Sequence, residues 1–143
     1  MSGVTLERIE QGFRMMQKWE DRYRLLIQMG RKLEPLDEEL KVEENRVQGC
    51  ASNVWLVSEP TDDDPPRLRF RADSDAHIVK GLVALLLAIY SDRTPEEALQ
   101  VDAQAILNRL ELKGHLSPSR SNGLFAMVER IRALAVAEAA SRG

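Results

Sequence analysis

Residues 78–89 include a single charged side chain, and this run constrains most strongly how the chain can fold. At helical spacing its apolar side chains leave almost no polar side, and a helix of that kind is buried in a protein core. We therefore expect a long central helix that starts at Asp73-Ser74-Asp75 and ends near Ser91. At its start, Asp73 or Ser74 would cap the first amides, and Asp75 suits the positive end of the helix dipole.

Apolar residues at three- and four-residue spacing predict further helices around this centre. Thr94-Pro95-Glu96-Glu97 has the pattern of a capping box with proline at the first helical position, and Ser117-Pro118 opens the last helix in the same way. The additional helices are predicted at residues 5–16, 18–32, 94–100, 102–110 and 118–140.

Between residues 46 and 72 the pattern changes from helical to strand spacing. Three short strands are predicted at residues 46–48, 53–58 and 67–72, joined by a tight turn and by a loop rich in proline and aspartate. The predicted fold class is therefore α+β, with a small three-stranded antiparallel sheet packed against helices. We expect residues 1–143 to form a single domain.

The charge pattern argues against nucleic acids and membranes as partners. The net charge is −3 and the 20 basic residues are scattered, whereas proteins that bind phosphate backbones normally carry a basic stripe. Arg67, Arg69 and Arg71 alternate with apolar residues, which is typical of the solvated face of an antiparallel sheet. The longest apolar run, residues 82–90, is far shorter than the roughly 20 residues that span a bilayer.

The cysteine and histidine content narrows the chemistry further. One cysteine allows no intramolecular disulfide, and the charged first ten residues lack the apolar run of a signal peptide, so we expect a cytoplasmic protein. Metal sites usually need three or four cysteine and histidine ligands. The sequence has one cysteine and two histidines, His77 and His115, so no metal site is predicted. The sequence also has no glycine-rich phosphate loop and no nucleophile elbow.

Cys50 is the residue on which a functional interpretation depends. A lone free cysteine is most often a buried, inert packing residue. Here, however, Gly49 precedes it and short polar residues follow it, a pattern that predicts a tight turn presenting the thiol. A Cys50–His77 or Cys50–His115 pair in a small cysteine enzyme stays open at this point.

Four segments, taken in order along the chain, resemble the SufE family. They are the early Trp19-Glu20-Asp21-Arg22-Tyr23, then Val47-Gln48-Gly49-Cys50-Ala51-Ser52-Asn53-Val54-Trp55, the stretch that opens with Asp73-Ser74-Asp75 and continues to Leu82, and the stretch from Leu116 to Leu124. Ala72 stands where the family commonly has glycine. The resemblance covers nearly the whole chain.

The resemblance implies an α+β fold shared with iron–sulfur scaffold proteins of the IscU type. It implies a sulfur acceptor that takes persulfide sulfur from a PLP-dependent, SufS-like cysteine desulfurase onto Cys50, stimulates that enzyme, and passes the sulfur to a downstream iron–sulfur scaffold complex. Such an accessory protein would need no cofactor of its own. Whether it is a monomer or a homodimer stays open.

Other residues of these segments are candidates for supporting the cysteine loop or binding the partner. Gly123 is expected to pack closely, because glycine inside a helix costs about 1 kcal/mol relative to alanine. Arg120 could donate hydrogen bonds to the loop or to the desulfurase, or could simply be a charge on the first turn of the last helix. We expect Cys50 to rest partly sheltered by apolar side chains and to swing out on docking. The full set of candidates is Gln48, Gly49, Ser52, Asp73, Ser74, Asp75, Arg120, Asn122 and Gly123.

Three other interpretations remain besides sulfur acceptance. The chain could be a cluster scaffold, against which the single cysteine argues. It could be a small enzyme that uses Cys50 with His77 or His115. It could also be a structural domain in which the thiol is buried and inert.

Overall fold

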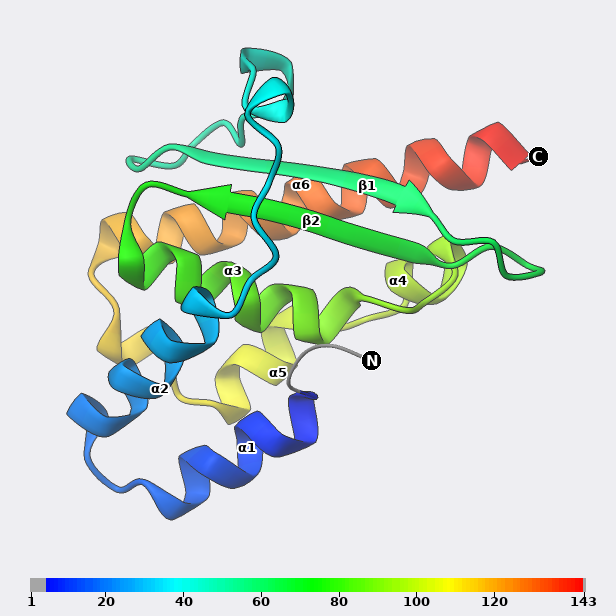
Figure 1. The fold of residues 1–143 in the computed structure, drawn as a ribbon. Coiled ribbons are helices and arrows are strands. Elements are labelled where there is room, and N and C mark those ends of the chain that lie inside the picture. The colour runs from blue at the N-terminus through cyan, green and yellow to red at the C-terminus, as the bar shows by residue number, and fades with distance from the viewer. Residues whose placement is uncertain (1–4, 143) are drawn as a thin grey trace.

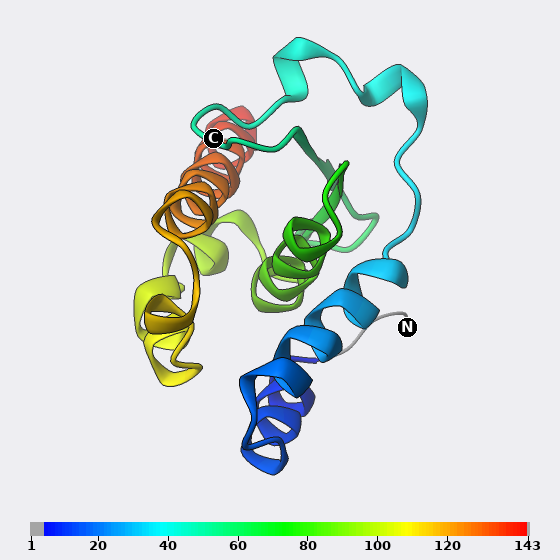
Figure 2. The same cartoon turned by 90° about the vertical axis from the view of Figure 1, so that its left-hand side faces the viewer.

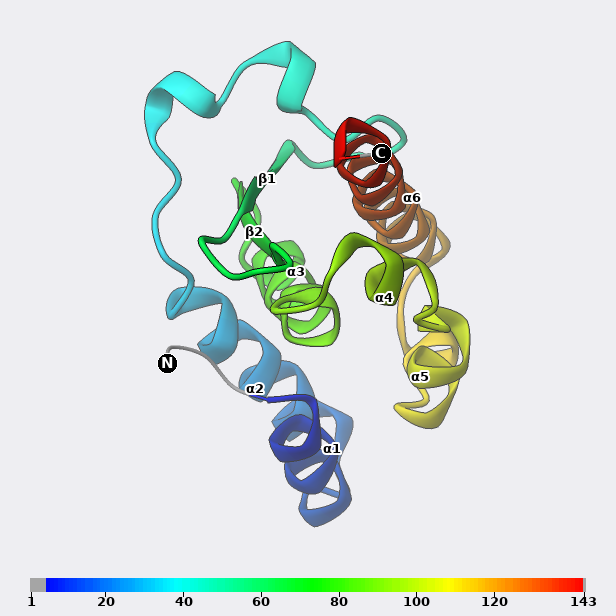
Figure 3. The same ribbon diagram turned by 90° about the vertical axis from the view of Figure 1, so that its right-hand side faces the viewer.

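Helix α3, His77–Tyr90, lies at the centre of the fold, as its apolar sequence predicts. The computed structural model describes residues 5–142. Helix α2, Trp19–Arg31, lies on one side of α3, and α6, Pro118–Arg142, lies on the other (Figures 2 and 3). The remaining elements of this part of the chain are α1 Leu6–Met15, α4 Pro95–Leu99, α5 Ala103–Arg109, strands β1 Val54–Pro60 and β2 Leu68–Ser74, and the short 3₁₀ turns η1 Glu38–Leu40, η2 Glu43–Asn45 and η3 Lys113–His115.

Helices α2 and α3 approach each other closely because glycines face one another at their crossing. A Cβ built on Gly30 would lie 2.7 Å from the amide nitrogen of Gly81, and one built on Gly81 would lie 2.6 Å from the carbonyl carbon of Leu26. Both distances are too short for a real side chain, so this contact depends on the absence of side chains at the two glycines.

Strands β1 and β2 form an antiparallel sheet against α3, as Figure 1 shows. Leu56 pairs with Ala72 and Ser58 with Phe70, and the apolar side chains of this face enter the core. Arg67 and Arg69 are exposed, while Arg71 is half-buried and pairs with Glu59. The alternating pattern therefore predicted the two faces of the sheet correctly, and the α+β fold class is confirmed.

The third predicted strand, residues 46–48, is wrong: the sheet has two strands within the described residues. What remains of it is an isolated bridge between Arg46 and Trp55, with the Val47 amide donating to the Val54 carbonyl at 2.8 Å. The pairing ends there because Gly49 turns the backbone with φ at +91°. A ladder cannot continue through such a turn.

The predicted start of the central helix is also wrong. Strand β2 continues through Asp73 and Ser74, and α3 begins at His77 after Ala76, which provides no side-chain cap. The side chains expected to cap the helix are otherwise engaged, because Asp73 binds two lysines and Asp75 binds Asn53. Only Ser74 keeps a link to the helix start, since its hydroxyl accepts a bond from the Ala76 amide at 3.3 Å.

The helix starts predicted further along the chain are confirmed. Thr94 and Glu97 form the reciprocal capping box of α4, and Asp102 caps α5 by accepting from the Ala105 amide at 3.0 Å. In the part of the chain that is described, no helix combines the length and the apolar character needed to cross a membrane.

Candidate functional site

Cys50 lies at the tip of a turn that closes directly onto the sheet. Gly49, with φ at +91°, makes the reversal before it, and the Val47–Val54 hydrogen bond closes the base of the turn. We call residues 48–53 the cysteine loop. A thiol in this position lies outside the regular ladder of β1, so it takes no part in the strand pairing.

The thiol of Cys50 points toward the first turns of α6 and is half-buried. Its Sγ donates to the Gly123 carbonyl at 3.4 Å. A cavity of about 30 Å³ adjoins it, which is room for one or two water-sized groups. The cavity is lined by Cys50, Ala51, Ser52, Val79, Leu82, Ser119, Arg120, Gly123 and Met127. Its floor is apolar, because Val79, Leu82 and Met127 are all buried core residues.

Two glycines lie where the cysteine loop packs against α6. A Cβ on Gly123 would lie 3.5 Å from the Cys50 Sγ, and a Cβ on Gly49 would lie 3.3 Å from the Cβ of Ala126. Gly123 therefore packs against Cys50 as expected, and a methyl group there would meet the thiol at ordinary van der Waals distance. A side chain larger than methyl at Gly123 would occupy the space in which the thiol now rests.

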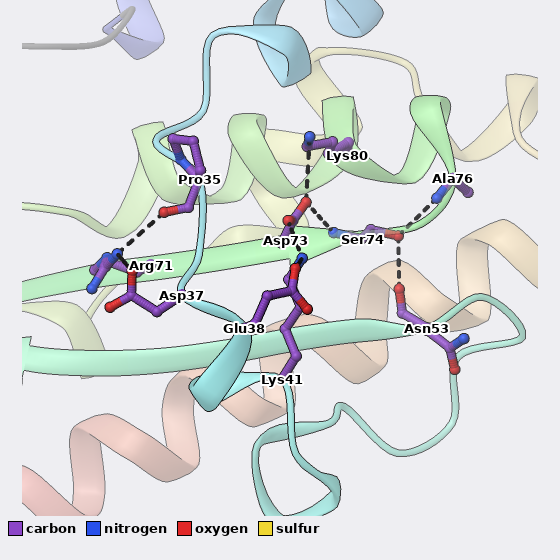
Figure 4. A network of polar contacts seen from close by, with 10 residues as sticks. All are labelled: Pro35, Asp37, Glu38, Lys41, Asn53, Arg71, Asp73, Ser74, Ala76 and Lys80. Atoms are coloured by element: carbon purple, nitrogen blue, oxygen red, sulfur yellow. Dashed lines mark hydrogen bonds and ion pairs between the residues drawn. The ribbon is translucent and has the colours of Figure 1, made fainter.

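The far end of the cysteine loop is tied to the end of β2. The Ser74 hydroxyl donates to the Asn53 carbonyl at 2.8 Å, as Figure 4 shows. The Asp75 carboxylate accepts from the Asn53 amide at 3.2 Å and from its side-chain nitrogen at 2.8 Å. Ser74 and Asp75 thus contact the loop through Asn53 and do not touch the thiol.

Removal of the Asp75 carboxylate should loosen the cysteine loop. Asp75→Ala leaves the Asn53 side chain and amide without their acceptor, and we expect Cys50 to react several-fold faster with iodoacetamide while the fold stays intact. Asp62→Ala, which removes an exposed carboxylate from the distant loop after β1, is the matched control. Equal alkylation rates for Asp75→Ala and wild type would show that this tether does not restrain the thiol.

Asp73 lies in a separate ion cluster next to the loop. Its carboxylate pairs with Lys41 at 3.1 Å and with Lys80 at 3.3 Å (Figure 4). Burial alone would raise the pKa of Asp73, but hydrogen bonds from Lys41 and from the Ser74 amide, together with the charge of Lys80, hold it below its usual value. The cluster fastens the segment 33–46, which crosses the outer face of the sheet in Figure 1, onto β2.

The other candidates differ in how close they lie to Cys50. Ser52 and Arg120 line the cavity, and the Arg120 guanidinium makes no hydrogen bond or ion pair to any described residue. Gln48 is exposed and donates to Glu43 at 3.4 Å. Asn122 is exposed on the first turns of α6. The structure therefore brings Ser52, Arg120 and Gly123 together at the thiol and places Gln48 and Asn122 on the surrounding surface.

Comparisons with known proteins identify the family of this chain. The model of the family described as "SufE: Fe-S metabolism associated domain" matches residues 7–135. This chain belongs to the SufE family. Membership places it in iron–sulfur metabolism, and the matched range contains Cys50, the end of β2 and the start of α6.

Individual SufE-like proteins are similar to this chain over most of their length. An uncharacterized SufE-like protein of Rhizobium meliloti (strain 1021) is 46% identical over 130 residues, which cover 90% of this chain and 93% of that protein. Another, from Rhizobium etli, is 46% identical over 139 residues, which cover 96% and 94%. The solution structure of a hypothetical protein from Thermus thermophilus superposes with a TM-score of 0.76 at 22% identity, covering 98% of this chain and 99% of that one, and shows the same fold.

Neither histidine of this SufE-family chain lines the cavity beside Cys50. His77 is exposed on the first turn of α3, and the His115 ring stacks on Trp19 with centroids 3.9 Å apart. Within the described residues no group of three or more histidine, cysteine, aspartate or glutamate side chains could hold a metal ion. In this structure neither histidine therefore lies at the Cys50 thiol.

Burial raises the pKa of the Cys50 thiol above its usual value, and the positive charge of Arg46 opposes this shift only in part. Because the thiolate is the reactive form, an alkylating reagent should modify Cys50 of the resting protein more slowly than it modifies free cysteine at pH 8. We expect the rate to keep rising with pH beyond the range in which an ordinary cysteine has levelled off. A rate profile from about pH 6 to 11, measured by mass spectrometry against free cysteine, checks this, and an earlier plateau than that of free cysteine would contradict it.

Several contact residues of the site were not predicted from the sequence. Asn53 links the loop to Ser74 and Asp75, and Arg46 places a charge near the thiol. Val79, Leu82 and Met127 fit the helical stripes of a core, so nothing in their spacing distinguished the cavity floor from ordinary packing. For Asn53 there was one available signal, since a short polar residue directly after a turn is typical of side-chain bonds to the backbone.

Proposed function

We propose that this SufE-family protein accepts a sulfur atom from a PLP-dependent cysteine desulfurase onto Cys50 and passes it on for iron–sulfur cluster assembly. The observation that carries the proposal is the placement of the single thiol. It sits on a tethered turn outside the sheet ladder, against a small cavity with an apolar floor, in a chain of a family associated with iron–sulfur metabolism.

The proposed transfer is a thiol–disulfide type of exchange. The Cys50 thiolate attacks the outer sulfur of a persulfide on the desulfurase, so the bond between Cys50 Sγ and that sulfur forms while the sulfur–sulfur bond of the donor breaks. The desulfurase cysteine leaves as a thiolate, and the proton stays on the transferred sulfur. The number of electrons is unchanged, and the step needs no oxidant or reductant.

The proposed transfer uses two positions of the Cys50 thiol, the buried resting position and an exposed position in the docked complex. Attack requires access and a thiolate, both of which the buried resting position disfavours. Swinging the loop out on docking would expose Cys50 and lower its pKa toward the ordinary value, which favours the thiolate. Return to the apolar cavity would then shelter the persulfide from water-borne oxidants and stray thiols until an acceptor binds.

We also propose the partners of the reaction and the compartment in which it takes place. Residues 1–143 act as one acceptor domain with no cofactor of its own, stimulate a SufS-like desulfurase by removing its persulfide, and deliver sulfur to an iron–sulfur scaffold complex. Free thiols are maintained in reducing compartments, for which we propose the cytoplasm. Arg120, exposed beside the cavity with a guanidinium that no described residue pairs, is proposed to contact the docked desulfurase.

The test is alanine release by a purified desulfurase supplied with cysteine. Addition of the protein should raise the rate, and protein alkylated beforehand at Cys50 should leave it unchanged. Protein treated with quenched reagent is the control. Equal stimulation by alkylated and untreated protein would refute sulfur acceptance at Cys50, and turnover without any desulfurase would instead indicate an enzyme in its own right.

A further inference from the structure

A second cavity lies away from Cys50, between the end of α3, the start of α5 and one face of α6. Its volume is about 190 Å³, on the order of six water molecules. The α6 residues Phe125, Val128, Glu129 and Arg132 follow helical spacing and so lie on a single face. Tyr90, Val101, Asp102, Ala103 and Gln104 complete the walls.

The Tyr90 hydroxyl is a buried polar group beside Arg132 that no described residue meets at hydrogen-bond geometry. Tyr90 has an exposed fraction of 0%, and its hydroxyl makes no hydrogen bond to any described residue. Burial raises the pKa of Tyr90, the charge of Arg132 and a polar contact from its guanidinium oppose the shift, and the charges of Glu129 and Asp102 add to it. These three charged side chains therefore act on the hydroxyl from nearby. A buried hydroxyl left unpaired is costly, so its presence at a cavity wall points to a group that binds there.

The charged groups around the cavity are also largely unpaired. Arg132 donates to the Leu99 carbonyl at 3.2 Å, and within residues 5–142 no ion pair joins it to Asp102 or Glu129. Asp102 uses one carboxylate oxygen to cap α5, and Glu129 is exposed with no polar partner in the same range. A guanidinium and two carboxylates thus line one cavity without neutralising each other.

We propose that this cavity binds a small free amino acid. Its carboxylate would take the remaining donors of Arg132 and the Tyr90 hydroxyl, and its ammonium group would lie at Glu129 and Asp102. The side chain would rest on Phe125 and Val128. A zwitterion satisfies both signs of charge at once, whereas a simple carboxylate leaves the acidic wall unpaired and a simple amine leaves Arg132 unpaired.

Ligand titrations of the full-length ¹⁵N-labelled protein test the class of ligand. L-Serine, L-lactate and ethanolamine have similar sizes, but only serine carries both charges. We expect serine to shift the amide signals of residues 101–104 and 128–132 with saturation in the millimolar range, and lactate and ethanolamine to bind about tenfold more weakly or less. No shift with about 20 mM serine would overturn the proposal, as would equal binding of lactate, which would make this an anion site.

Two variants test which groups form the site. Tyr90→Phe removes only a hydroxyl that has no partner among the described residues, so Tm should stay unchanged while serine binding weakens several-fold. Glu129→Gln should weaken the binding of serine more than the binding of lactate. Glu138→Gln, on the same helix but outside the cavity lining, is the matched control. Unchanged serine affinity in both Tyr90→Phe and Glu129→Gln would overturn the assignment. Neither variant alters the Cys50 site, so this test is independent of sulfur acceptance.

Discussion

Substitution of Cys50 by serine should leave the fold intact and reduce stimulation of a desulfurase to nothing. Serine is slightly smaller than cysteine and can keep the contact with the Gly123 carbonyl, so stability should change little. A hydroxyl is a poor nucleophile at neutral pH and cannot hold a persulfide, because sulfur transfer requires a thiolate. Alanine release in the presence of Cys50→Ser should therefore equal the rate of the desulfurase alone.

Ala137→Ser is the matched control, since it adds a hydroxyl at an exposed position of α6 outside the cavity lining and keeps the thiol. This variant should stimulate the desulfurase as well as wild type does. If Cys50→Ser retained half of the stimulation, binding of the protein and not its thiol would activate the enzyme, and the proposed relay would be wrong.

The largest effect on stability is expected from Gly81→Ala. Its Cβ would fall on the carbonyl of Leu26 across the α2–α3 contact, and that neighbour is backbone, which cannot rotate away. The two helices must then separate, which loosens contacts along both. We expect a loss of about 3 kcal/mol in the free energy of unfolding, despite the helix propensity gained with alanine.

Urea denaturation of Gly81→Ala and Gly114→Ala measures this directly. A Cβ on Gly114 meets nothing within 4 Å, so the same chemical change there should be neutral or slightly stabilising. A Gly81→Ala protein as stable as wild type would mean that α2 and α3 do not depend on this close approach.

Local features of the sequence were enough to predict much of the fold. The apolar run of 78–89 predicted a central helix, and the spacing around Thr94 and Asp102 predicted helix starts that the structure confirms. These features depend on side chains a few residues apart, which sequence spacing reports directly.

The errors arose where partners distant in the sequence determine the local structure. Asp73-Ser74-Asp75 has the composition of a helix cap, but contacts with Lys41, Lys80 and Asn53 hold it in β2 and the turn that follows. Residues 46–48 have the composition of a strand, yet the turn at Gly49 leaves room for one bridge only. Propensity does not include such tertiary contacts.

In the candidate site, too, local features could be predicted from the sequence and contacts between distant residues could not. The turn at Gly49-Cys50 could be predicted, because glycine at a positive φ has a local sequence signal. The cavity could not, because its walls come from the cysteine loop, α3 and α6, and the Cys50 and Gly123 pair is separated by 73 residues. The second cavity, at Tyr90, was likewise hidden, since Tyr90 fits the apolar helix in which it lies.

The most direct test of the central claim is the intact mass of the wild-type protein after incubation with a cysteine desulfurase and cysteine. Sulfur acceptance predicts an added mass of about 32 Da, located on the peptide that contains Cys50 and removed by a thiol reductant. An unchanged mass, in a sample where the desulfurase itself carries a persulfide and the Cys50 thiol can still be alkylated, would contradict it.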